Sequence, residues 1–197
     1  MPNERLTPQL LMRRVHLRDL PAIVLPPGYA LRHFRPGDEP AWEKIIEETF
    51  QTTNYVFDAA MKANACFRPE RVWFITQDDQ PVATASAWQE PRFGPLIGAL
   101  HMVGVRPGHQ GRQLGYWVSL AALHRFVVEG RIEAALQTDD FRLAAVKTYL
   151  RMGFEPVLVN ENQRDRWRTI FTAISRPDLA AQFEPILNGP VTNVEGV

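Results

Sequence analysis

The stretch that decides the fold reads VGVRPGHQGRQLGYWV, residues 103–118. An apolar run over residues 97–105 leads into it, Pro107 and Gly108 end that run, and a helix-like stretch follows to about Glu129. The first amides of a helix have no acceptor within the helix, and its dipole places partial positive charge there. A turn with little side-chain bulk lets an anion approach those amides. The order strand, turn, helix therefore predicts an anion-binding site here.

Composition sets broad limits on the protein class. The 197 residues are 45% hydrophobic, enough for one sizeable core or one domain with an extension. Lys plus Arg equals Asp plus Glu at 22 each, so no global basic surface argues for nucleic acid. Cys66 is the only cysteine, which excludes an internal disulfide and fits a reducing, cytoplasmic location. Residues 1–14 have no secretory h-region, and no apolar run of about 18 residues predicts a membrane span.

Hydrophobic periodicity and turn residues predict the elements that surround this stretch. The expected strands are residues 10–15, 29–34, 71–77, 82–88, 97–105, 132–138 and 154–159. The expected helices are residues 39–50, 55–65, 111–129, 141–151, 162–174 and 178–187, with Asp38 and the Asp139–Asp140 pair as N-caps. Antiparallel strands followed by strand–helix–strand–helix–strand indicate an α/β or α+β sheet with helices on both faces. The parallel pair would be residues 97–105 beside 132–138.

Spacing separates the anion-binding stretch from two well-known phosphate motifs. No Lys-Ser/Thr follows a glycine, which excludes G-x-x-x-x-G-K-[ST], and G-x-G-x-x-G is not in phase with the helix start. The residues from Val105 to Gly115 do match V-x-P-x-x-[QR]-G-x-x-[LI]-G. Here the chain resembles the GCN5-related N-acetyltransferases. The resemblance implies a mixed, mostly antiparallel central sheet, with a splayed parallel strand pair and helices on both faces.

The resemblance also implies a set of residues that bind acetyl-CoA. In the family, backbone amides of this loop bind the pyrophosphate, and the preceding strand bonds the pantetheine arm. The phosphate positions carried over are Gln110, Gly111, Arg112, Gln113, Leu114, Gly115 and Tyr116, and the strand positions are Val103, Gly104 and Val105. Gln113 departs from the pattern, because the family usually has glycine there. Its side chain either points away from the phosphates or hinders their approach.

A second stretch, TDDFRLAAVKTYLRMGF over residues 138–154, supports the first. It resembles the family signature N-x-x-A-[IV]-x-x-Y-x-x-x-G-F. Ala145-Val146, Tyr149 and Gly153-Phe154 match, whereas Arg142 replaces the usual Asn, which commonly bonds the pantetheine. Arg142 would instead reach a phosphate. The likeness covers roughly residues 29–160, which we expect to be the transferase domain, after a leader of residues 1–28 that includes a packed strand. Residues 161–197 would form a helical extension and a loose tail.

Two residues are the catalytic candidates. When an amine attacks a thioester, the sulfur leaves as a thiolate, and a tyrosine hydroxyl such as that of Tyr149 can protonate it. The alternative for Tyr149 is a packing role with a satisfied hydroxyl. His101 is the leading candidate for the general base, since some family members use histidines in this strand. The alternative is a half-buried strand histidine bonded to a neighbour.

Other residues are weaker candidates for the base. Many members place a glutamate in the strand at the position of Ala99, so that version of the site is absent. Glu90 in the preceding loop is a weaker base, and His109 fits the phosphate loop or the surface better. Cys66 has no His or acid partner nearby in sequence and reads as a small buried residue. The five histidines are scattered without metal-ligand spacing, so no metal site is expected.

The expected function is transfer of an acetyl group from acetyl-CoA to a primary amine without an acyl-enzyme. The partners would be acetyl-CoA and an amine acceptor, a small molecule rather than a protein, with neither nucleic acid nor membrane, and a homodimer is a possible assembly. The alternative is a catalytically silent acyl-CoA-binding regulatory module, and a third is a partner-binding domain without CoA. The sequence does not identify the acceptor, whose specificity would reside in residues 39–65, 89–95 and the C-terminal extension.

Overall fold

The computed structural model describes residues 8–53 and 55–192, which build one sheet with the strand order β2-β3-β4-β5-β6-β1-β7. The strands are β1 Leu10–Arg14, β2 Tyr29–His33, β3 Val72–Gln77, β4 Gln80–Trp88, β5 Ile97–Val105, β6 Glu133–Thr138 and β7 Glu155–Val157. All neighbours pair antiparallel except β5 and β6. The mixed, mostly antiparallel sheet with one parallel pair confirms the expected fold class.

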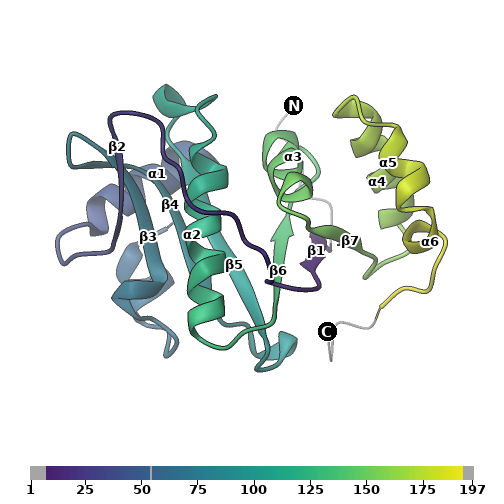
Figure 1. Ribbon diagram of the computed structural model, residues 1–197, viewed down its shortest axis with the longest axis horizontal. Helices are drawn as coiled ribbons and strands as arrows, with labels where there is room; N and C mark the ends of the chain where they lie inside the picture. Colours follow the sequence, from purple (N-terminus) through teal and green to yellow (C-terminus); the bar gives the residue numbers. More distant parts are fainter. Residues whose placement is uncertain (1–7, 54, 193–197) are drawn as a thin grey trace.

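Two long helices cover opposite faces of the sheet. Helix α1 (Glu39–Phe50) packs on β4 and β5, and α2 (Leu114–Val128) packs on β3, β4 and β5 from the other side (Figure 1). Trp42 and Ile45 of α1 are fully buried in one apolar cluster, and Val118 and Leu123 of α2 are fully buried in the other. The sheet between them is therefore held rigidly from both sides.

The parallel pair separates along its length. β5 and β6 are paired only from Ile97–Ala99 to Glu133–Ala135. Beyond Ala99 the β5 edge that faces β6 has no strand partner among the described residues. A bulge shifts the register with β4 between Thr84 and Ser86, and Met102 in it has a φ of 49°. Such bulges bend a strand and re-aim its groups, and this one lies where β5 leaves β6.

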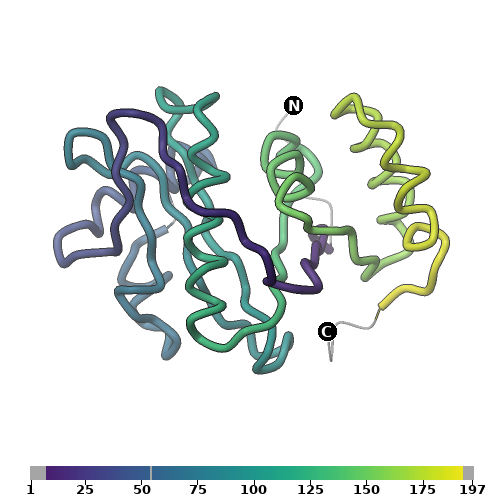
Figure 2. Tube along the Cα trace, in the orientation of Figure 1, coloured from purple at the N-terminus to yellow at the C-terminus, as the bar shows by residue number. Residues whose placement is uncertain are grey.

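The N-terminal strand lies inside the sheet rather than at its edge. β1 is antiparallel to both β6 and β7, and Leu10, Leu11 and Met12 are buried alternately in the two apolar clusters. The segment after it crosses α2 on the way to β2 at the far edge, and the ring nitrogen Nε2 of His124 on α2 lies 2.9 Å from the carbonyl oxygen of Pro21 (Figure 2). The strand expected at residues 10–15 is thus confirmed.

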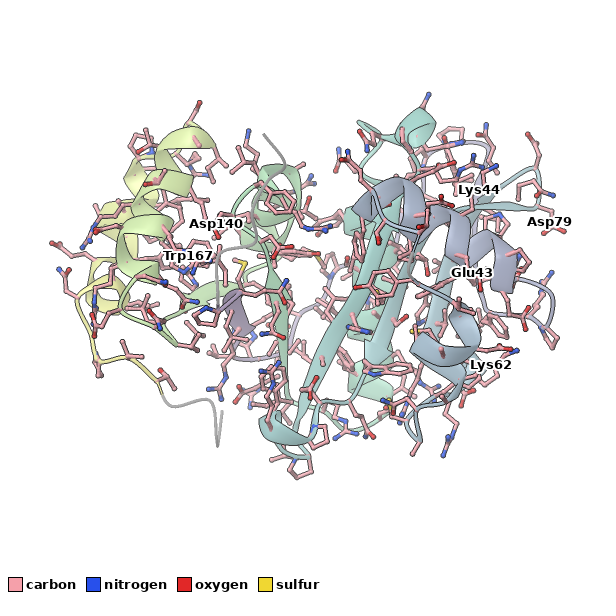
Figure 3. The ribbon with its side chains drawn as sticks, turned by 180° about the vertical axis from the view of Figure 1, so that it is seen from behind. Glu43, Lys44, Lys62, Asp79, Asp140 and Trp167 are labelled. Carbon is pink, nitrogen blue, oxygen red and sulfur yellow. The ribbon has the colours of Figure 1, made fainter. Side chains whose placement is uncertain are left out.

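The C-terminal helices pack beyond β7 and α3 (Leu143–Arg151). They are α4 Gln163–Ala173, α5 Asp178–Gln182 and α6 Glu184–Leu187. Arg166 of α4 donates to Asp140 at 2.6 and 2.9 Å, beside the fully buried Trp167 (Figure 3). The single helix expected over residues 178–187 is wrong, because Phe183 turns into the core between two short helices.

The helix expected over residues 55–65 is only partly formed. The only regular element there is a single π-helical turn, Asp58–Lys62. Helical spacing placed Val56, Ala59, Ala60 and Ala63 on the packed face, but of these only Ala60 packs against the core, whereas Phe57 and Met61 are fully buried. Phe57 stacks on Phe34 at 4.9 Å, and this aromatic contact overrides the local helical spacing.

Asp38 occupies the N-cap position of α1 as expected, but neither it nor the Asp139–Asp140 pair caps a helix with its side chain, because other partners bind the carboxylates. Asp38 precedes α1, but its carboxylate accepts from Arg32 at 2.6 and 2.8 Å and from the amide of Arg35. Helix α3 begins at Leu143 without a side-chain cap, and the Asp139 carboxylate accepts from Gln9 and Arg142.

Among the described residues no helix is long and apolar enough to cross a bilayer.

Candidate functional site

The loop before α2 leaves a row of free backbone donors. A short 3₁₀ turn, Pro107–His109, follows β5, and Gly111 (φ 77°) and Gln113 (φ 59°) then adopt left-handed conformations. An α-helix cannot include such residues, so α2 begins at Leu114 rather than at residue 111. The amides of Gly111 to Gly115 donate to no acceptor within the described part of the chain. This arrangement supports anion binding at the start of α2.

Contacts from both faces of the sheet fix this loop. Arg106 pairs with Glu48 of α1 at 2.9 and 3.1 Å, and Arg106 lowers the pKa of Glu48. The ring nitrogen Nδ1 of His109 lies 3.0 Å from the hydroxyl of Tyr29. Burial and the nearby Arg112 and Arg106 lower the pKa of His109, which favours the neutral ring. His109 therefore contributes to the support of the loop.

The side chains of the loop point away from the amides or pack beside them. The side-chain oxygen of Gln113 accepts from Arg151 of α3 at 2.5 Å, and Arg112 donates to the carbonyl of Gly108 at 2.9 Å. The Arg151 guanidinium lies over the Tyr116 ring at 4.6 Å. Gln110 is exposed, whereas Leu114 is buried in the core. Gln113 therefore has a side chain where the family usually has none, and Arg151 of α3 binds that side chain.

Three residues at the end of β5 line the splayed edge. Val103 and Val105 are half-buried against the apolar cluster that contains Val118 and Leu123 of α2, and Gly104 lies under α1. A Cβ on Gly104 would lie 2.9 Å from both Ile45 Cγ2 and Thr49 Oγ1. Glycine at position 104 therefore allows α1 to pack closely on β5. The main chain of Gly104 borders the gap between β5 and β6.

Tyr149 lies on α3 with its ring in the core. It is 7% exposed, its ring packs on Phe154, and its hydroxyl has no hydrogen-bond partner among the described residues. Burial raises the pKa of Tyr149 to about 12, an effect that the nearby Arg142 partly offsets. The phenol is therefore protonated at neutral pH, as a proton donor must be. The buried ring fits the packing alternative, whereas the hydroxyl, which has no partner among the described residues, also fits a proton donor.

His101 lies on β5, next to the bulge. Its ring stacks on Trp88 at 5.7 Å and makes no hydrogen bond to a described residue. Burial lowers the pKa of His101 to about 4, so the imidazole is neutral at physiological pH and is a weak base. Ser86 is its partner in the β4–β5 register, and the hydroxyl of Ser86 is buried without a hydrogen bond. Trp88 is one of the aromatic residues that the sequence offered for acceptor specificity, whereas Ser86 carried no recognisable signal.

Arg142 crosses the gap between the splayed strands. Its Nε donates to Asp139 at 3.0 Å, and its guanidinium lies 4.2 Å from the ring centre of Phe50, the last residue of α1. Because α1 rests on β5 and α3 follows β6, this contact spans the two strands. None of these partners belongs to residues 106–115, so the structure does not bring Arg142 together with the loop side chains. Phe50 was not among the residues that the sequence singled out for the site.

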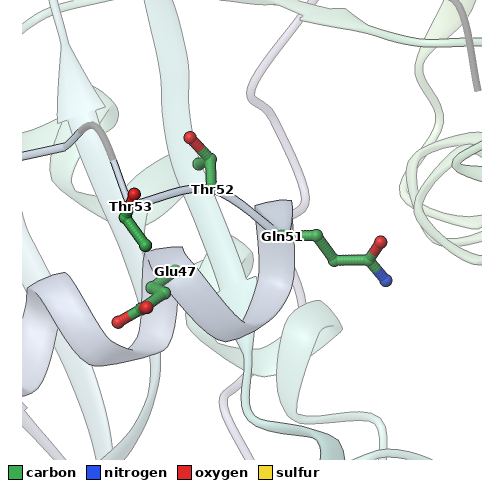
Figure 4. A pocket seen from close by; sticks show the side chains of 4 residues that line it. All are labelled: Glu47, Gln51, Thr52 and Thr53. Carbon is green, nitrogen blue, oxygen red and sulfur yellow. The ribbon is translucent and has the colours of Figure 1, made fainter. Parts of the chain in front are cut away.

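A hollow opens beside the end of α1. Its volume is about 440 Å³, and Glu47, Gln51, Thr52 and Thr53 line it (Figure 4). Glu90 does not lie among these residues; it is 42% exposed and 3.9 Å from Arg92. In the described ranges, no group of three or more His, Cys, Asp or Glu side chains is arranged to hold a metal ion. Of the residues named from the sequence, His101 lies on β5, Tyr149 lies on α3, and Arg142 directly precedes α3.

Comparisons with known proteins agree with this geometry. The model of the acetyltransferase (GNAT) family matches residues 38–154. Mycothiol acetyltransferase of Nocardia farcinica is 28% identical over 167 residues, covering 76% of this chain and 53% of the relative. That of Pseudarthrobacter chlorophenolicus is 33% identical over 147 residues, covering 69% and 45%. The chain thus spans about half the length of these relatives. A GCN5-related N-acetyltransferase from Sphaerobacter thermophilus has the same fold, with a TM-score of 0.60, 23% identity, and coverage of 76% and 49%.

Proposed function

Since the chain belongs to the GNAT family of acetyltransferases, we propose that it moves an acetyl group from acetyl-CoA to a primary amine of a small acceptor by direct transfer. The observation that carries the proposal is the row of free amides from Gly111 to Gly115 at the start of α2. These donors suit the pyrophosphate of CoA, and the unpaired β5 edge after Ala99 suits its pantetheine arm.

The roles of the loop and strand residues follow from their positions. The main chain of Gln110, Gly111, Arg112, Gln113, Leu114 and Gly115 would bind the phosphates, with Tyr116 packed beside them. The main chain of Val103, Gly104 and Val105 would bond the pantetheine. Acetyl-CoA would supply an activated thioester, and an amide near Val103 would polarise its carbonyl. The bulge at Met102 supports this role, because it turns the backbone where the strands part.

Two side chains would move protons in the transfer. The amine nitrogen forms a bond to the thioester carbon, and the carbon–sulfur bond breaks. His101 would accept the proton that the amine loses, directly or through water; the ring is neutral at physiological pH, as this role requires, although its low pKa makes it a weak base. Tyr149 would give its proton to the departing thiolate, and its raised pKa keeps that proton in place until then. No acyl-enzyme is required.

The remaining parts of the proposal concern the setting of the enzyme. The name of these relatives, mycothiol acetyltransferase, refers to a small molecule, which supports a small acceptor over a protein. We place the transferase domain at residues 29–160, a range that contains the whole family match, residues 38–154. A cytoplasmic location rests on the single cysteine, Cys66, and a homodimer rests on the family resemblance alone. Cell fractionation and light scattering test these two points.

Release of thiol from acetyl-CoA in the presence of an amine panel tests the activity. If the protein is an acetyltransferase, thiol release should require both the amine and the protein. A catalytically silent CoA-binding module would bind CoA and release no thiol above the rate of spontaneous hydrolysis with any amine. Mass spectrometry of the acetylated amine then identifies the acceptor.

A further inference from the structure

Arg142 is held in one orientation by three contacts. Its Nε donates to the buried Asp139, and its guanidinium lies over the rings of Phe50 at 4.2 Å and Phe141 at 5.4 Å. Asp139 is itself fixed, because Gln9 donates to its other oxygen at 2.8 Å. Aromatic rings and a carboxylate at Nε hold an arginine without using the end of its fork.

The end of the fork is free. Neither Nη1 nor Nη2 of Arg142 donates to an acceptor within residues 8–53 and 55–192, although the side chain is only 18% exposed. Guanidinium groups in this state bind carboxylates through two parallel hydrogen bonds. Because Asp139 and the rings already fix the side chain, little further ordering is needed for such binding.

The surroundings of Arg142 indicate which molecule brings the carboxylate. Phe50, beneath the guanidinium, is followed directly by Gln51, which lines the hollow at the end of α1. Glu47 in the same hollow is exposed and has no ion pair or hydrogen bond through its side chain to a described residue (Figure 4). Glu47 precedes Phe50 by three residues, nearly one helical turn, so a carboxylate and the guanidinium lie at the same end of α1. Such a pair fits a molecule that carries both an ammonium and a carboxylate group.

We propose that Arg142 sets the acceptor class by binding a carboxylate of the acceptor, so that the preferred acceptors are amino-acid-like primary amines. The inference rests on the proposed function, and it assigns Arg142 to the acceptor in place of the phosphate role that the sequence suggested. Arg142 is here a specificity residue, two helical turns before Tyr149 on α3. The proton transfers remain those of His101 and Tyr149.

A binding measurement tests this inference separately from turnover. Matched pairs, glycine with glycinamide and L-phenylalanine with L-phenylalaninamide, are titrated by calorimetry into the protein saturated with CoA. We expect the wild-type protein to bind the carboxylate member about tenfold more tightly, the usual scale for one charge-assisted pair. Arg142→Met should remove the preference, and Arg142→Lys should retain a smaller one, since Lys keeps the charge but not the fork.

Lys147→Met is the matched control, because Lys147 is an exposed cation on the same helix that contacts neither Phe50 nor Asp139. It should keep the full preference. Equal binding of both members, binding of neither, or a preference that survives Arg142→Met would each overturn the inference. So would a preference of the wild type for succinyl-CoA over acetyl-CoA that Arg142→Met abolishes, since the carboxylate would then come from the acyl group. Thiol release with any amine judges the proposed function independently.

Discussion

Arg151 on α3 donates a hydrogen bond of 2.5 Å to the side-chain oxygen of Gln113, at the end of the loop that precedes α2. Gln113 has a φ of 59°, a conformation in which glycine is unstrained. The pairing shows how the chain accommodates a long side chain where its family usually has glycine. The side chain is held by the neighbouring helix, and the loop amides keep the conformation that a glycine would allow.

The first prediction concerns this position. Gln113→Gly should leave the free energy of unfolding within about 1 kcal/mol of wild type, because relief of the left-handed strain offsets the greater entropy of the unfolded chain. Gln113→Val should lose about 1–3 kcal/mol and weaken CoA binding, since a β-branched residue resists positive φ. Urea unfolding and calorimetry with CoA measure both effects. A Val variant as stable as wild type would show that the loop is not held in this conformation.

Gly104→Ala tests the packing of α1 on β5. The new methyl group would lie 2.9 Å from side-chain atoms of Ile45 and Thr49, so α1 must shift. We expect a loss of about 1–3 kcal/mol in the free energy of unfolding, as for other overpacked cores. Gly108→Ala is the control: nothing lies within 4 Å of its added carbon, and its effect should stay within about 0.5 kcal/mol. Equal stability of the two variants would rule out this explanation of Gly104.

Tyr149→Phe tests the proton donor. Loss of the hydroxyl should lower kcat by about 10²-fold or more while leaving the affinity for CoA nearly unchanged. Because the pKa of Tyr149 is raised to about 12, the wild-type rate should show no alkaline limb from this residue below about pH 11. Steady-state kinetics across pH 6–10 measure both quantities. An unaltered kcat in the variant excludes the acid role.

His101 should make the protein sensitive to mild acid. Its pKa is lowered to about 4 in the folded state from an ordinary 6.5, so between these values the unfolded chain binds more protons. Its contribution to stability is therefore complete above pH 6.5 and is lost as the pH falls toward 4. His101→Gln should flatten the pH dependence of the free energy of unfolding in this window, measured by urea titration at pH 4.5 and 7.5. If the variant and the wild type keep the same slope, the ring is not desolvated.

Local sequence carried much of the fold and of the loop. Residues 103–118 have glycine and proline signals, and residues 138–154 have the glycine signal of Gly153; these act within a few residues, so their elements were predictable. The structure of residues 55–65 could not be predicted in this way, because Phe57 stacks on Phe34, which is distant in the sequence. The caps failed for the same reason: Asp38 and Asp139 bind distant or unexpected cations in place of helix amides.

The site shows the same division between local and long-range information. Tyr149 and His101 were named from spacing, but their protonation states depend on burial that only the folded chain supplies. The contact of Arg142 with Phe50 joins residues far apart in sequence and leaves no local pattern. Likewise, no sequence signal showed that β1 would pair between β6 and β7. The contacts that join the β5 side of the gap to the β6 side could therefore not be predicted from the sequence.

A titration of the ¹⁵N-labelled protein with CoA, followed by NMR, tests the central claim most directly. The account predicts saturable binding, with the largest shifts at the amides of Gly111 to Gly115, because these free donors would bond the pyrophosphate. Pantetheine, which lacks the phosphates, should leave these amides nearly unmoved. No binding at millimolar CoA, or shifts that leave Gly111 to Gly115 unaffected, would contradict the account.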